Sequence, residues 1–316
     1  MSMAVPAPAP PAKLSAAEYL AIFEELKNWG TWGPDDERGT LNLIGPAERA
    51  AALRLATGDT TINLGQTLSS VPGPTNMFPI VHGVLPDVHA HLTDGTEIGH
   101  HLEFLGMRIH GHAITHLDAL CHFSLDGLMY NGHRCGETPL PSKATIATMR
   151  EGIVARGVLL DIPRALRVDW MEPGHSVSNE IAEYTERVQG VRVGKGDVVL
   201  VRTGRFVRQN KLGPWETMLQ LAGTDATFLR WMRERQAAIL GCDGVSDTYP
   251  SPTEGLRTAM HVLALVAMGM PLIDNAVLEP VAEACAARGR WEFLLVIAPL
   301  DYPGGSSSPV EPIAIF

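Results

Sequence analysis

The most informative stretch of this sequence is HGHAITHLDALCHF, residues 110–123. It carries imidazoles and a carboxylate close together, which is the ligand set that borderline divalent ions prefer. A single histidine in a protein is more often a solvated surface residue or a satisfied core residue. The combined spacing of His112, His116, Asp118 and His122 instead favours a metal centre.

The spacing also predicts the local backbone. On a continuous helix Asp118 would point about 200° away from His116, so a helix cannot present three ligands. On a straight strand His112 and Asp118 would share a face but stand about 20 Å apart. One ion can gather His112, His116 and Asp118 only if the chain bends, so we expect an irregular segment that enters or leaves a strand.

Histidine is concentrated around this stretch. Nine of the twelve histidines lie between His82 and His122, and histidine-rich tracts are typical of metal binding. Those outside the spaced set are interpreted as substrate-pocket or surface residues: His82, His89, His91, His100 and His101.

Composition excludes several classes of protein. Twenty-five basic and 35 acidic residues give a net charge of −10, so no basic surface is expected for nucleic acid or an anionic membrane. The four cysteines are far apart and form no CxxC pair, which indicates reduced thiols and a cytoplasmic location. The apolar run 260–270 is too short to span a bilayer.

The order of elements predicts an α/β fold. Residues 1–14 are rich in Pro and Ala and are expected to form a disordered tail, without the features of a signal peptide. Residues 15–316 are expected to form one domain with an N-terminal helical arm over 15–28. Further helices are predicted over 47–56, 178–188, 225–235 and 277–287, and strands over 60–69, 157–162, 197–202 and 293–298.

The chain resembles a known family at several ordered motifs. HAITHLDALCHF is similar to the HxGTHxDxPxHF signature of the metal-dependent cyclase-family hydrolases, which include bacterial kynurenine formamidase and isatin hydrolase. This chain departs from that signature at Ile114 and Leu120, where the family has Gly and Pro, but no ligand is lost. The other matching motifs are WGPDDERGTLN (32–42), DGLMYNG (126–132), GDVVLVRTG (196–204), His261 with GMPLID (269–274), and SPVEPIA (308–314).

The resemblance implies a swivelling β/β/α fold, a bound divalent ion and assembly as homodimers or homotetramers. By position His112, His116 and Asp118 match the ligands of a first ion, and His122 matches the catalytic histidine. His261 matches a histidine at a second ion site. Zn and Mn both suit such ligands.

Asp274 is the main departure from the family. It occupies the position of a family Glu that helps to hold the second ion, and its side chain is one methylene shorter. Two roles stay open, metal ligation and capping of the helix predicted after it. Because the shorter arm displaces the carboxylate, we expect one tightly held ion.

The expected reaction is hydrolysis of a carbon–nitrogen bond in an amide, aryl formamide or cyclic amide. An ion in such a site activates water, and His122 can accept and return a proton. A lactone hydrolase, a cyclase and a non-catalytic metal-stabilised binding protein are the alternatives. The family analogy suggests a planar, partly aromatic substrate, and the candidate pocket walls are Trp32, Phe78, Phe104, Met107 and Tyr130.

Overall fold

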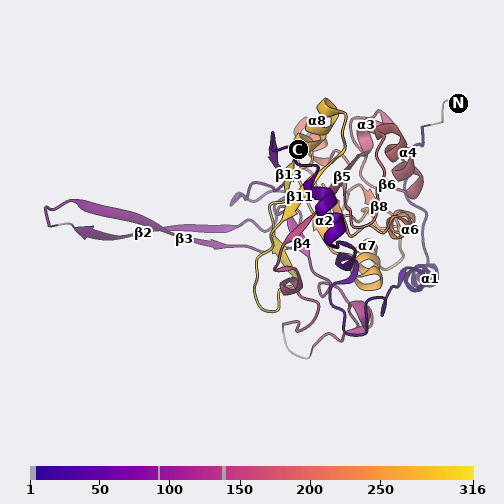
Figure 1. The fold of residues 1–316 in the computed structure, drawn as a ribbon, viewed down its shortest axis with the longest axis horizontal. Helices are drawn as coiled ribbons and strands as arrows, with labels where there is room; N and C mark the ends of the chain where they lie inside the picture. The colour runs from indigo at the N-terminus through magenta and orange to yellow at the C-terminus, as the bar shows by residue number, and fades with distance from the viewer. Residues whose placement is uncertain (1–4, 92, 137–139) are drawn as a thin grey trace.

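A large sheet runs through the body of the protein (Figure 1). It has nine strands in the order β1-β13-β11-β5-β7-β9-β10-β4-β12. The computed structural model describes residues 5–91, 93–136 and 140–316. The strands of this sheet are β1 (Thr61–Asn63), β4 (His116–Asp118), β5 (Ile153–Asp161), β7 (Val198–Arg202), β9 (Ile239–Cys242), β10 (Leu272–Asp274), β11 (Glu292–Ile297), β12 (Ser307–Pro309) and β13 (Ile313–Ile315).

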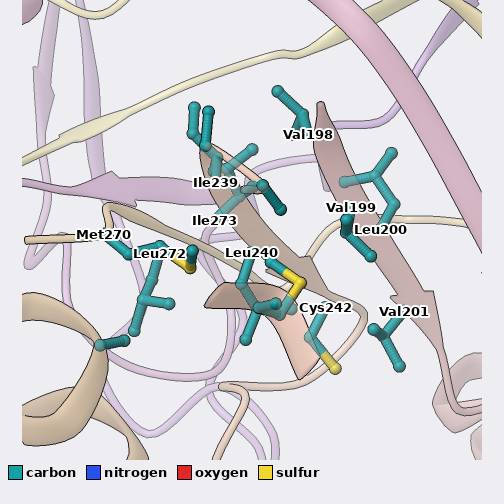
Figure 2. Packing of buried hydrophobic residues seen from close by; sticks show 14 of the residues in the cluster. Val198, Val199, Leu200, Val201, Ile239, Leu240, Cys242, Met270, Leu272 and Ile273 are labelled. Atoms are coloured by element: carbon teal, nitrogen blue, oxygen red, sulfur yellow. The ribbon is translucent and has the colours of Figure 1, made fainter. Parts of the chain in front are cut away.

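The centre of the sheet is parallel, and its strands β7, β9 and β10 are buried along their whole length. β5, β7, β9 and β10 pair in parallel, while β4 pairs antiparallel with both β10 and β12. Figure 2 shows the β-branched and aliphatic side chains of β7, β9 and β10 packed together. Strands buried on both faces read as continuous apolar runs, which is why VVLV at 198–201 predicts a strand without alternation.

Helices cover the sheet, and their starts follow local capping signals. Ser15 and Glu18 form a capping box at α1, and Ser178 and Asp225 cap α4 and α6. The helices are α1 (Ala16–Leu26), α2 (Pro46–Leu53), α3 (Ile162–Leu166), α4 (Asn179–Gln189), α5 (Arg205–Leu212), α6 (Ala226–Arg235), α7 (Ala259–His261) and α8 (Glu279–Arg288). The expected α/β class is confirmed.

Two predicted segments differ from the structure. The strand expected over 60–69 ends at Asn63, because Leu64 and Gly65 form hydrogen bonds outside the sheet, the latter to the Asn63 side chain. The tail expected to be disordered is held in its second half. Ser176 donates its N–H to the Ala9 carbonyl, and Leu14 donates to Pro252.

The apolar run at 260–270 is a core element. It forms α7 and a π-helical segment, Val262–Met268, whose side chains are all buried. Within the described part of the chain, no helix has the length and apolar character needed to cross a membrane.

A long antiparallel hairpin extends away from the body (Figure 1). It pairs β2 (Val81–His91) with β3 (Glu97–Gly106), and its exposed side chains include Val81, Leu85 and Phe104. These two strands were not predicted from the sequence. A small third sheet pairs β6 (Ser176–Val177) with β8 (Gly223–Thr224).

Candidate metal centre and active site

The candidate site is built on β4, between β10 and β12. His116 and Asp118 alternate along β4 and therefore share one face of the sheet. His116 lies directly opposite Asp274 of β10, and side chains at opposed positions lie on the same face. Strand register thus brings Asp274 to the His116 and Asp118 side chains across more than 150 residues of sequence.

The backbone before β4 bends as expected. Residues 110–114 are irregular and lead into β4, so His110 and His112 leave the line of the strand. Asp274 ends β10, and the N-cap of α8 is Leu278. The alternative role of Asp274 as a helix cap is therefore wrong.

Nitrogen and carboxylate oxygen atoms converge on Asp118. Its Oδ1 lies 3.2 Å from His110 Nδ1 and 3.6 Å from His116 Nε2, and its Oδ2 lies 3.6 Å from His261 Nε2. Asp274 Oδ2 lies 3.4 Å from the same His261 atom. Two groups offer ligand atoms within 4.8 Å of one another, and they share Asp118: His116, Asp118 and Asp274, and His110, Asp118 and His122.

Several of these atoms are buried and form no hydrogen bond, even where two of them lie at a short distance, as His110 Nδ1 and Asp118 Oδ1 do. Both Asp118 carboxylate oxygens, Asp274 Oδ1 and the Nδ1 atoms of His110 and His112 are in this state. Buried polar atoms in folded proteins are nearly always paired, because an unpaired one loses its hydration. The unpaired set consists of carboxylate oxygen and imidazole nitrogen, so these residues fit a divalent cation.

A backbone carbonyl orients the His116 ring. His116 Nδ1 lies 2.8 Å from the Ile114 oxygen. Since a carbonyl can only accept, Nδ1 carries the proton and Nε2 presents its lone pair towards Asp118 and Asp274. This is the tautomer that a ligand needs.

The buried carboxylate and imidazoles perturb one another. Burial alone would raise the pKa of Asp118, but the nearby His122 and His116 hold that pKa well below its usual range. Burial lowers the pKa of His122, and of His112, to about 3, so both rings are neutral at ordinary pH. His261 differs, because Asp247 and Asp274 overcome burial and raise its pKa well above the ordinary value.

Two residues of the site were not identified from the sequence. His110 stacks on His122 with ring centroids 3.7 Å apart, and it joins one ligand group although only the later histidines were proposed as ligands. The sequence offered one indication of this role, because His110 lies two residues before His112, at the same even spacing as the proposed ligands. Asp247 hydrogen-bonds His261 Nδ1 and accepts from the Met260 N–H. No local pattern marks Asp247, because only the tertiary fold brings it to His261.

The predicted ligands occupy different places in the site. His116, Asp118, His261 and Asp274 lie together. His112 lines the same pocket, but its ring faces Tyr249, with centroids 6.2 Å apart, and it belongs to neither ligand group.

The pocket above the cluster is largely apolar and aromatic. Of the five candidate wall residues, Phe78 lines it, and the Arg108 guanidinium lies 3.9 Å above the Phe78 ring. Other apolar and aromatic residues of the pocket wall are Ile114, Phe123, Met218, Val245 and Tyr249.

The structure does not bring the other four candidates to this pocket. Phe104 is on the exposed β2–β3 hairpin, Trp32 is half-buried in a turn, and Met107 follows the end of β3. Tyr130 is fully buried and donates to Asp36 Oδ2 at 3.1 Å. Its ring packs on Gly269, where a Cβ would come within 2.4 Å, so Tyr130 is a core residue.

Comparison with known families agrees with this arrangement. The model of the family described as putative cyclase matches residues 59–247, which include β4 and the bend before it. The chain belongs to the cyclase family. Among curated proteins, none matches the chain significantly.

Solved structures share the fold of this cyclase-family chain. A protein described as a novel cyclase is 26% identical and superposes with a TM-score of 0.81, covering 93% of this chain and 99% of its own. Isatin hydrolase A from Ralstonia solanacearum is 21% identical, with a TM-score of 0.55 over 84% of this chain and 94% of its own. An isatin hydrolase bound to thioisatinate is 15% identical, with a TM-score of 0.53 over 85% and 97%. The expected cyclase-like fold is confirmed.

Proposed function

We propose that this cyclase-family protein is a metal-dependent hydrolase of a carbon–nitrogen bond in an amide, aryl formamide or cyclic amide. The observation that carries the proposal is the buried His/Asp cluster, whose unpartnered ligand atoms lie at an apolar pocket. Family membership supports it, and the solved relatives of the same fold include isatin hydrolases, whose named substrate is a cyclic amide.

His116, Asp118 and Asp274 would hold the ion, with His261 beside them. The chemistry that a bound divalent ion supplies is activation of water and polarisation of the scissile carbonyl. Zn and Mn both suit imidazole and carboxylate ligands, so either is proposed. Asp247 holds His261 through its Nδ1, as partners of ligand histidines commonly do.

His122 is the proposed proton shuttle. Its neutral ring can take a proton from the attacking water and return it to the leaving nitrogen, and the adjacent Asp118 carboxylate would stabilise the protonated ring, since its charge opposes the effect of burial on the pKa of His122. Stacking on His110 fixes the plane of the His122 ring, and Phe123 and His261 lie edge-on or tilted around them.

The pocket supports a planar, partly aromatic substrate. Phe78, Phe123 and Tyr249 offer ring faces and edges, and aliphatic side chains fill the remaining wall. We also propose a cytoplasmic location, because the four cysteines are free thiols and three of them are buried.

Metal analysis followed by hydrolysis assays tests the proposal. The purified protein is expected to contain divalent metal, to hydrolyse N-formyl aromatic amines or isatin-like lactams, and to lose turnover after chelation. Preferred turnover of lactones would identify a lactone hydrolase, and ring closure in place of hydrolysis would identify a cyclase. Stoichiometric metal without turnover over a broad panel would identify a binding protein.

A further inference from the structure

Asn275 lies immediately after Asp274 and is fully buried. Its φ is +60°, a left-handed conformation that asparagine tolerates better than most residues. The Asn275 side-chain amide donates to the Gly111 carbonyl at 2.8 Å and to the Ile114 carbonyl at 3.2 Å. One side chain therefore holds both ends of the bend that precedes β4.

Arg205, the first residue of α5, hydrogen-bonds both the bend and Asn275. It is buried, and its guanidinium donates to the His112 carbonyl at 2.7 Å, to Asn275 Oδ1 at 2.6 Å and to the Asp243 carbonyl at 3.1 Å. Burial lowers the pKa of Arg205 to about 10, so the guanidinium is still charged at neutral pH.

The bend depends on these side chains because it lies outside the strands and has no β-sheet hydrogen bonds of its own. The carbonyls of Gly111, His112 and Ile114 are all bonded by Asn275 or Arg205. The Ile114 carbonyl also accepts from His116 Nδ1, the contact that orients the His116 ring. Asn275 thus supports the Ile114 carbonyl, which positions the proposed ligand His116. Asn275 also directly follows the proposed ligand Asp274 in the chain.

We propose that Asn275 and Arg205 are positioning residues that preorganise the bend and so set the affinity for the divalent ion. This inference rests on the metal site of the proposed function. Neither side chain belongs to a ligand group; both act through the backbone of residues 111–114. Removal of such outer partners typically weakens metal binding by about 10–100-fold.

Asn275→Asp is the sharpest test, because the change keeps the shape of the side chain and removes the donor to two carbonyls. The matched control is Asn131→Asp. Asn131 also has a positive φ, of +61°, and its amide donates to the carbonyls of Gly33, Pro34 and Asp36, but it does not line the pocket.

Zn²⁺ affinity is measured by competition with a chromophoric chelator, alongside the melting temperature of the metal-free protein and the visible spectrum of the Co²⁺ form. We expect Asn275→Asp to weaken Zn²⁺ binding by about 10–100-fold and to change the Co²⁺ spectrum. Asn131→Asp is expected to lower the melting temperature but to keep the wild-type Zn²⁺ affinity and the wild-type Co²⁺ spectrum. Asn275→Gly, which accepts the positive φ, provides the same test if the Asp variant does not fold.

Wild-type Zn²⁺ affinity in folded Asn275→Asp or Asn275→Gly would overturn the inference and leave the proposed function intact. Equal loss of affinity in Asn131→Asp would also overturn it, since the effect would then reflect general destabilisation. Absence of metal binding by the wild-type protein would overturn the proposed function and the inference together.

Discussion

His116 and His122 lie on one short segment but have different surroundings. His116 presents Nε2 to Asp118 and Asp274, whereas His122 is stacked on His110 at the pocket. A ligand holds the ion directly, while a proton shuttle need only lie within hydrogen-bond reach. We expect His116→Ala and Asp118→Ala to lose metal, and His122→Ala to retain metal and lose most of its turnover.

Metal content and single-turnover rates of the purified variants check this assignment. Wild-type metal occupancy in His116→Ala would contradict the role of His116. Loss of metal in His122→Ala would instead make His122 a ligand, in the group that it forms with His110 and Asp118.

We propose that Asp274 determines how many metal ions the site holds. Its shorter side chain reaches the His116 and His261 atoms at 3.9 and 3.4 Å. We propose one tightly held ion per wild-type chain, and a ratio that rises towards two in Asp274→Glu, whose longer arm matches the family residue. Metal per chain by elemental analysis measures the ratio, and two ions in the wild type would refute the proposal.

At the scale of elements, the start of α8 carries a pH-sensitive contact. Glu279, the first residue of α8, contacts the Arg202 guanidinium at 3.3 Å. A helix N-terminus favours an ionised carboxylate, but burial, with repulsion from Asp243, raises the pKa of Glu279 to about 7. The contribution of Glu279 to the free energy of unfolding is therefore complete below pH 4.5, the ordinary pKa of this side chain in the unfolded chain. It is lost as the pH rises through about 7.

Glu279→Gln removes this titration. We expect the free energy of unfolding of the wild type, relative to the variant, to fall by roughly 1–3 kcal/mol between pH 4.5 and pH 8. Urea unfolding at a series of pH values measures the difference. A difference that stays constant, or one that grows with pH, would contradict the assignment.

At the scale of the whole molecule, the β2–β3 hairpin leaves an apolar face uncovered. Leu85 pairs with Leu102 and Gly83 with Phe104, so these side chains share a face with Val81. These four apolar residues, and Ile98 on the same face of β3, are about half exposed or more. A two-stranded hairpin alone is marginally stable in water, so a partner surface is expected to cover this face.

The area of the hairpin favours a second copy of the chain as that partner. One face of a ten-residue ribbon measures about 33 by 10 Å. A single arm on an unrelated partner would bury about 660 Å² in total, below a standard interface, while two exchanged arms bury about 1,300 Å². We therefore propose that the expected homodimer or homotetramer forms through reciprocal contacts of this hairpin.

Leu85→Lys with Leu102→Lys tests that interface. We expect light scattering after gel filtration to give a dimer or tetramer for the wild type and a smaller species for the double variant. Val84→Lys is the matched control, because Val84 is exposed on the other face of the same ribbon. A monomeric wild type, or an unchanged double variant, would refute the proposal.

Local chemistry in the sequence determined much of this protein. The capping box of Ser15 and Glu18 placed α1, and the apolar run at 198–201 placed β7. The spacing of His112, His116 and Asp118 predicted the bend before β4, but Asn275 and Arg205 hold that bend from distant parts of the chain. The predictions of α1 and β7 succeed because a capping box and an apolar run each lie within a few consecutive residues.

Only the tertiary structure decided which groups meet. Asp274 reaches His116 through strand register, Asp247 reaches His261 through the fold around α7, and Asn275 holds a bend far away in the sequence. Tyr130, expected at the pocket, lies in the core because Gly269 leaves room for its ring. Such contacts depend on the pairing of distant segments, and a single sequence carries no local pattern that specifies that pairing.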